Sequence, residues 1–176
     1  ERENLLRVVP RLSALEVEVD LLVIDDASPD GTGDVAEELT ARYRRLSVLH
    51  RKRKEGLGPA YVHGFREALR RGYARVVTMD ADLSHSPEDV PRLLRVLEEA
   101  DVVVGSRHVS GGGVEDWPFS RRLLSRGGSL YARALLRLPV SDATSGFRAY
   151  RSEALREVDL GVIRSRGFVF QVEMLR

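Results

Sequence analysis

Short apolar runs alternate with amphipathic stretches along the first two thirds of the chain. Apolar runs bounded by polar residues predict buried strands, and apolar residues that recur at helical spacing predict helices. The predicted strands span residues 21–25, 46–50, 75–79 and 101–105. The predicted helices span residues 33–45, 59–71 and 87–99. This alternation favours an α/β fold, in which helices flank a Rossmann-like, mostly parallel sheet.

Local signals mark the helix ends. Ser86 is a typical N-cap residue, and Gly72 is a typical helix stop. After the last predicted strand come the glycines at 111–113 and then a basic amphipathic stretch at 120–137, which predicts a long helix. No repeat or linker divides the chain, so we expect one domain over residues 1–176. Because the chain opens within a predicted helix, we also expect that a short first strand lies outside it.

The composition narrows the classes of function. With 28 Lys and Arg against 27 Asp and Glu, the chain has no overall basic excess. We therefore expect no nucleic-acid partner and only local anion sites. The absence of cysteine excludes disulfides, Cys-ligated zinc and thiol nucleophiles. The longest apolar runs are strand-sized, whereas a membrane span needs about 20 apolar residues.

Two carboxylates, Asp80 and Asp82, directly follow the predicted strand 75–79. On an extended chain, the i, i+2 spacing places both side chains on one face. Two like charges so close favour a cation, and oxygen ligands suit Mg²⁺ or Mn²⁺ that also binds substrate phosphates. Ser84 would add a hydroxyl or hold a water. The alternative is a solvated Asp-rich turn before the next helix.

A second acidic segment follows the predicted strand 21–25, where Asp25 and Asp26 precede a turn. Ligands of open α/β sheets bind outside the carboxyl ends of the strands. Carboxylates there can accept hydrogen bonds from ribose hydroxyls or base N–H groups, so we assign Asp25 and Asp26 to ligand binding. We assign Asp30 and Thr32 to structure, as caps of the next helix.

Basic residues at the same edge are candidates for phosphate binding. Arg107 follows the last predicted strand, and an arginine can bind phosphate through two parallel hydrogen bonds. Arg121 and Ser125 are four residues apart and share a helix face, where together they could hold a phosphate. A solvated basic helix face is the alternative. The basic run and glycines at 51–58 are either a phosphate-facing loop or a solvated turn.

Other catalytic patterns are absent. Gly31-x-Gly33 lacks the third glycine of a dinucleotide fingerprint, and no Walker A lysine motif is present. The chain contains no Ser-His-Asp order and no nucleophile elbow. The histidines, which show no common metal spacing and are expected to be structural, are His50, His63, His85 and His108.

Several motifs run in order from one end of the chain to the other. They include Ile24-Asp25-Asp26-x-Ser28-Pro29-Asp30-Gly31-Thr32, Gly56-Leu57-Gly58-x-Ala60-Tyr61, Met79-Asp80-Ala81-Asp82-Leu83-Ser84, Gly105-Ser106-Arg107, Ser125-Arg126-Gly127, Asp142-x-Thr144-Ser145-Gly146-Phe147-Arg148 and Phe170-Gln171-x-Glu173-Met174. By these motifs the chain resembles the dolichyl-phosphate and polyprenol-phosphate mannosyltransferases, which are inverting family 2 glycosyltransferases of GT-A fold. The chain ends before a basic segment that such enzymes place over the donor pyrophosphate.

The resemblance implies a donor site for GDP-mannose. The donor contacts that it implies are Glu1, Ile24, Asp26, Asp80, Ala81, Asp82 and Arg107. Asp82 and Asp80 would bind the metal, with Ser84 as a weak third ligand. Asp82 and Arg107 would carry the catalytic role, and Arg121 and Ser125 would hold the acceptor phosphate.

The resemblance also implies the reaction. Mannose would pass to a polyprenyl phosphate with inversion, and the anionic acceptor would need no dedicated base. The protein would then work at the cytoplasmic face of a membrane, bound peripherally or through a membrane-anchoring partner. The glycine-rich loop at 111–119 and the basic helix are candidates for facing an anionic membrane surface.

Three rival functions stay open. A family 2 enzyme could use another nucleotide sugar, such as UDP-glucose, or another acceptor. A nucleotide-sugar-binding module without catalysis would bind the donor but neither transfer nor hydrolyse it. A nucleotide-dependent oxidoreductase is disfavoured by the missing glycine fingerprint.

Overall fold

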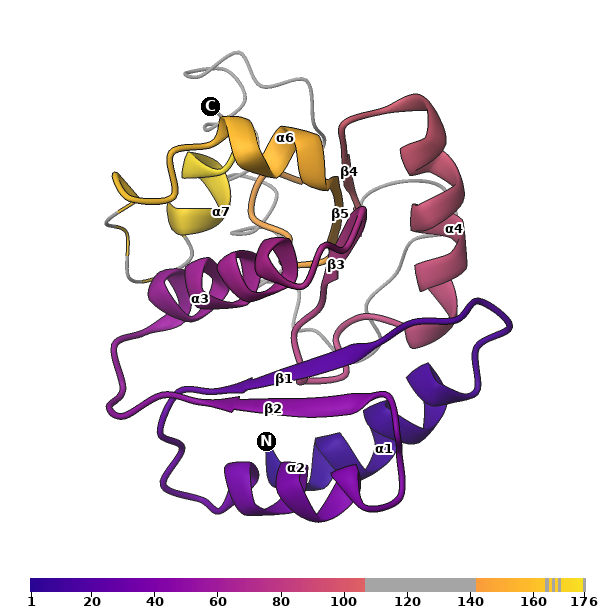
Figure 1. Cartoon of the computed structure of the whole chain (residues 1–176), viewed down its shortest axis with the longest axis vertical. Helices are drawn as coiled ribbons and strands as arrows, with labels where there is room; N and C mark the ends of the chain where they lie inside the picture. Colours follow the sequence, from indigo (N-terminus) through magenta and orange to yellow (C-terminus); the bar gives the residue numbers. More distant parts are fainter. Residues whose placement is uncertain (107–141, 164, 166, 168, 176) are drawn as a thin grey trace, which may run out of the picture.

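The structure, a computed structural model, describes residues 1–106, 142–163, 165, 167 and 169–175 (Figure 1). In the first of these ranges, strands and helices alternate as predicted. The strands are β1 (Leu21–Asp25), β2 (Leu46–His50), β3 (Arg75–Thr78) and β4 (Val102–Val104). The helices are α1 (Arg2–Ser13), α2 (Thr32–Thr40), α3 (Leu57–Arg70) and α4 (Val90–Val96). Later in the chain follow β5 (Arg148–Arg151), α6 (Ser152–Glu157) and α7 (Val169–Glu173).

Two predicted helix boundaries are wrong. The helix expected over 33–45 ends at Thr40, because the chain must turn there before it enters β2. The helix expected over 87–99 is α-helical only in α4, between the 3₁₀ turns η1 (Pro87–Asp89) and η2 (Leu97–Glu99). Pro91 lacks the N–H that would bond to the carbonyl of Pro87, so an α-helical first turn cannot form.

β1 and β2 form a parallel pair, in which Leu21 lies opposite Leu46 and Asp25 opposite His50. The two carboxyl ends therefore lie at one edge, and the loops that follow them meet there. Figure 1 shows α1 and α2 on one side of this pair and α3 on the other. Both faces are thus covered, as expected for a buried parallel sheet.

The remaining strands form a second sheet in the order β3-β5-β4. β5 pairs antiparallel with β3 on one side and with β4 on the other, so β3 and β4 run in the same direction. The predicted α/β class is confirmed, with one antiparallel strand added. That strand was not predicted, because Arg148-Ala149-Tyr150-Arg151 contains no apolar run.

Three apolar clusters form the core. The first joins α1 and α2 to the β1–β2 pair, and the second joins α3 to β5, α6 and α7. The third joins α4 to the other face of β5. Successive β5 residues alternate between two of these clusters, with Tyr150 in the second and Ala149 in the third. Within the described ranges, no helix is long and apolar enough to cross a bilayer.

Candidate active site

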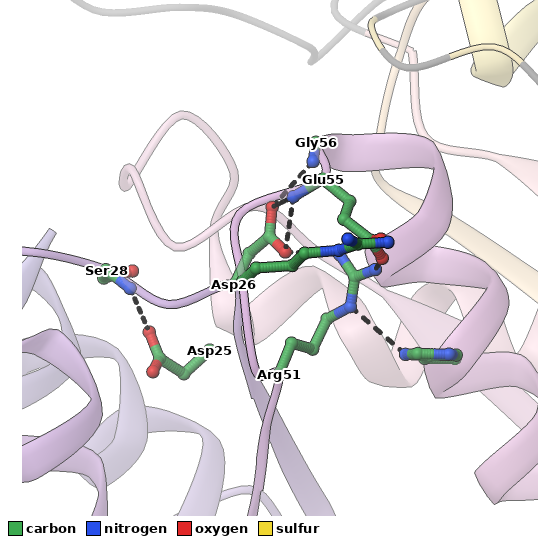
Figure 2. A network of polar contacts seen from close by, with 8 residues as sticks. Asp25, Asp26, Ser28, Arg51, Glu55 and Gly56 are labelled. Carbon is green, nitrogen blue, oxygen red and sulfur yellow. Dashed lines mark hydrogen bonds and ion pairs between the residues drawn. The ribbon is translucent and has the colours of Figure 1, made fainter.

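Asp25 ends β1 and is engaged with its own surroundings (Figure 2). Its Oδ1 accepts the Ser28 N–H at 3.1 Å, and its Oδ2 lies 3.3 Å from Nδ1 of His50. A Cβ on Gly33 would come within 2.6 Å of Oδ2, so glycine is needed there. Burial favours the neutral acid, yet the bonds from Ser28 and His50 outweigh it and hold the pKa of Asp25 below its ordinary value. Asp25 thus shapes the turn, and its contact with the nucleotide stays a prediction.

Asp26 organises the loop between β2 and α3. Its carboxylate pairs with Arg51 and accepts the backbone N–H groups of Glu55, at 3.2 Å, and Gly56, at 2.8 Å (Figure 2). The Arg51 side chain is only 3% exposed and also pairs with Glu55. Its Nε donates to Nδ1 of His63 at 3.1 Å. The N–H groups of this loop therefore serve Asp26, which counts against a phosphate-facing glycine loop.

The turn from β1 into α2 is structural, as predicted. Asp30 Oδ1 accepts the N–H of Thr32 at 3.1 Å and its hydroxyl at 2.6 Å. The N-cap position itself belongs to Gly31, whose φ of 76° favours glycine. The amino group of Glu1 donates to Asp30 Oδ2 at 2.8 Å, which places Glu1 at the same edge as β1's carboxyl end.

The acidic pair at the end of β3 lies in a turn. β3 ends at Thr78, earlier than predicted, and Leu83 adopts a left-handed φ of 63°. The expectation that an extended chain sets Asp80 and Asp82 on one face is therefore wrong. A non-glycine residue in this conformation is uncommon and costs about 1–2 kcal/mol. Such strain is typical of functional turns.

Asp80 is held beneath the loop that follows residue 141. Its Oδ1 accepts the hydroxyl of Tyr61, from α3, at 2.8 Å. A Cβ on Gly146 would lie 2.7 Å from Asp80 Oδ2 and 2.9 Å from the Tyr61 oxygen. Burial first, and then the charge of Asp80, raise the pKa of Tyr61 well above its ordinary value. Tyr61 therefore remains a hydrogen-bond donor at physiological pH.

Asp82 is exposed and partly committed to its own turn. Its Oδ1 accepts the N–H of Ser84 at 2.9 Å. Burial would raise the pKa of Asp82, but the hydrogen bonds from the side chain and backbone of Ser84 lower it below the ordinary value. Asp82 therefore stays ionised at neutral pH.

The loop 142–147 completes the site and was missed as a functional element. Asp142 Oδ1 accepts the Thr144 N–H at 3.3 Å, and Thr78 donates to the Gly146 carbonyl at 2.8 Å. Arg148, fully buried, donates to the carbonyls of Ala143, Ser145 and Gln171, at 2.7, 2.8 and 2.7 Å. The loop is therefore anchored to β3 and to α7. The sequence offered the small residues of this motif as a signal, but no partner for them.

The acidic turn fits a divalent cation that a substrate helps to bind. Asp80 and Asp82 supply hard carboxylate oxygens, which suit Mg²⁺ or Mn²⁺. Because Gly146 has no side chain, the Asp80 carboxylate can lie close against the backbone of the 142–147 loop. Among the residues whose placement is described, no group of three or more His, Asp or Glu could hold a metal. A cation bound by Asp80 and Asp82 would complete its coordination with substrate phosphates or water.

The other predicted site residues either pack within the fold or lie outside the described residues. Ile24 packs on α3, where a Cβ on Gly64 would meet its Cδ1 at 2.4 Å. Ala81 packs against the first apolar cluster. Arg107, Arg121 and Ser125 lie outside the described residues, as does the predicted membrane-facing segment.

Two histidines besides His50 have structural positions, as predicted. His85 is buried and stacks on Phe147, with ring centroids 5.0 Å apart. His63 accepts a hydrogen bond from Arg51. His108 is outside the described residues.

Comparisons with known proteins show the family of the chain. The family described as glycosyl transferase family 2 matches residues 1–159. Undecaprenyl-phosphate mannosyltransferase of Micrococcus luteus is 52% identical over 174 residues, which cover 99% of this chain and 72% of that protein. Polyprenol monophosphomannose synthase of Mycolicibacterium smegmatis is 48% identical over 176 residues, which cover 99% and 66%. Dolichol-phosphate mannosyltransferase of Pyrococcus furiosus is 40% identical over 182 residues, which cover 99% and 49%.

A solved structure supports the fold. A mannosyltransferase from Pyrobaculum calidifontis, in complex with GDP-mannose and Mn²⁺, is similar with a TM-score of 0.58 and 18% identity. The similarity covers 90% of this chain and 44% of that one. At this identity the likeness concerns the fold alone, and it confirms the predicted fold class. The chain spans less than two thirds of the length of this structure and of two of the three relatives.

Proposed function

The chain belongs to glycosyl transferase family 2, and we propose that it transfers mannose from GDP-mannose to a polyprenyl phosphate. Three relatives of 40% to 52% identity carry names of this activity. These names agree with the polyprenol-phosphate mannosyltransferases, the group of family 2 that the sequence motifs resemble. We assign all 176 residues to one catalytic domain.

The observation that carries the proposal is the acidic turn at the end of β3. Asp80 and Asp82 stand there with Tyr61 and Gly146 around Asp80. This arrangement suits a nucleotide diphosphate bound together with a divalent cation. Mg²⁺ or Mn²⁺, when bound by Asp80, Asp82 and the weaker ligand Ser84, supplies Lewis-acid stabilisation of the charge on the departing GDP.

The donor nucleotide would lie along the edge where β1 ends. Asp25 and Asp26 shape that edge, and Ile24, Glu1 and Ala81 would add the contacts to the donor that the resemblance implies. Because the carboxylate of Asp26 also holds the loop at 51–56, nucleotide contact and loop order are coupled there. Arg107 would stabilise the diphosphate charge.

The acceptor would reach the sugar from the other side. Arg121 and Ser125 would hold its phosphate, which is already ionised and attacks the anomeric carbon without a general base. In-line attack breaks the bond to the diphosphate and inverts the configuration. We infer that the protein works at a membrane surface, because its acceptor is a lipid, and we place it at the cytoplasmic face as the resemblance implies.

The test uses the full-length protein with GDP-mannose labelled in the sugar, a polyprenyl phosphate, and Mn²⁺ or Mg²⁺. We expect label in the lipid extract, lost on EDTA addition and in Asp82→Ala. Label from UDP-glucose but not from GDP-mannose would instead favour another donor. Donor binding without transfer or hydrolysis would identify a binding module.

A further inference from the structure

The hydroxyl of Tyr61 is placed to control one carboxylate of the acidic turn. It donates to Asp80 Oδ1 at 2.8 Å, a distance typical of a well-formed O–H···O bond. Tyr61 belongs to α3, the helix that precedes β3, and lies 19 residues before Asp80. The hydrogen bond thus ties the acidic turn to a separate, rigid element of the fold.

The ring of Tyr61 is itself fixed. Its centroid lies 6.1 Å from that of Phe65 and 5.3 Å from that of Phe170. Both phenylalanines belong to the second apolar cluster and are almost fully buried. Because this packing fixes the ring, the position of the Tyr61 hydroxyl is fixed as well. The hydrogen bond therefore orients the Asp80 carboxylate toward the ring.

The backbone of Gly146 packs against the Asp80 carboxylate. Gly146 approaches so closely that a Cβ would lie within 3 Å of both Asp80 oxygens. The hydroxyl of Thr78 holds the Gly146 carbonyl at 2.8 Å, which keeps this loop in place. Asp80 is therefore confined between a hydroxyl on one side and a glycine on the other.

We propose that Tyr61 is a positioning residue, which fixes the orientation of the Asp80 carboxylate for the divalent cation of the donor complex. The proposal rests on the proposed function, because it takes Asp80 as a metal ligand. Hydrogen bonds to metal ligands hold them in the binding orientation, and their removal typically lowers metal affinity or activity about 10- to 100-fold.

Tyr61→Phe removes the hydroxyl and keeps the ring, so it tests the contact with Asp80 while the ring packing stays intact. The matched control is Tyr73→Phe, because the hydroxyl of Tyr73 donates to Asp20 at 2.7 Å, outside the acidic turn. Mn²⁺ binding in the presence of GDP is measured by electron paramagnetic resonance, and thermal unfolding is measured in parallel. We expect Tyr61→Phe to weaken Mn²⁺ binding about 10-fold, and Tyr73→Phe to leave it unchanged.

Repeating the Tyr61→Phe substitution in an Asp80→Ala variant separates a positioning role from a general destabilisation of the fold. In Asp80→Ala, the carboxylate that Tyr61 orients is gone, so adding Tyr61→Phe should not weaken Mn²⁺ binding further. Equal weakening in both backgrounds would overturn the positioning role. So would unchanged Mn²⁺ affinity in Tyr61→Phe with a lowered unfolding temperature. Absence of Mn²⁺ and GDP binding to the unaltered protein would overturn the proposed function itself.

Discussion

Asp26→Ala tests whether the loop at 51–56 is built on one buried ion pair. The substitution removes the carboxylate that pairs with Arg51 and accepts the N–H groups of Glu55 and Gly56. The Arg51 side chain is 3% exposed and Asp26 is 18% exposed, so solvent replaces little of what is lost. Removing one partner of a buried pair costs about 3–5 kcal/mol.

The lower end of that range applies here, because Glu55 still pairs with Arg51 in the variant. A loss of about 3 kcal/mol corresponds to a fall of about 6–12 °C in the unfolding midpoint of a domain of this size. Scanning calorimetry measures it directly. The control is Asp101→Ala, whose side chain is exposed, and which should stay within about 0.5 kcal/mol of the parent.

A second variant distinguishes a buried unpaired charge from a lost packing contact. If the cost of Asp26→Ala comes from leaving Arg51 uncompensated, then adding Arg51→Met should restore part of the lost stability. A fall of less than about 2 °C in Asp26→Ala, which is under 1 kcal/mol, would refute the reasoning. So would a double variant whose loss of stability, relative to the parent, equals the sum of the losses of the two single variants.

Three further outcomes follow from the site. Gly146→Ala should cut mannose transfer about 10-fold or more, because its Cβ would meet the Asp80 carboxylate; initial rates with labelled donor check this, and a parent-like rate would contradict it. Arg148→Met should lower the free energy of unfolding by about 3 kcal/mol, since three buried carbonyls lose a charged donor; an unchanged urea midpoint would count against it. The pKa of His50 is raised, most by Glu37, so its protonated form stabilises the fold at low pH and this contribution is lost as pH rises above 6.5. His50→Gln should therefore flatten the fall of unfolding temperature with rising pH, and an unaltered pH profile would disprove this.

The sequence predicted the first half of the fold well, because apolar periodicity dominates there. Strands β1 and β2 have the predicted bounds, and Gly72 ends α3 with a φ of 79°. β5 escaped prediction because its burial comes from long-range pairing of Tyr150 and Arg148 with β3 and β4. No local pattern in four residues reports such pairing.

The sequence indicates the carboxylates of the candidate site but not the side chains that hold them. An acidic pair after a strand is a local signal, and it led to Asp80 and Asp82. Tyr61 has the apolar spacing of any buried helix face, so nothing in the sequence assigns its hydroxyl to Asp80. Arg51 lies in a basic run whose next three residues are exposed, and only the fold distinguishes it from them.

The place of β5 in its sheet has a consequence for synthesis of the protein on the ribosome. β3 and β4 are complete before β5 exists, and they cannot pair with each other across the position that it will fill. At about 5–20 residues per second, the roughly 40 residues between β4 and β5 take about 2–8 s to translate. Two strand edges must stay unpaired in the nascent chain during that time. Gly146 is made just before β5, so neither the second sheet nor the surroundings of Asp80 can be complete until this segment has been synthesised.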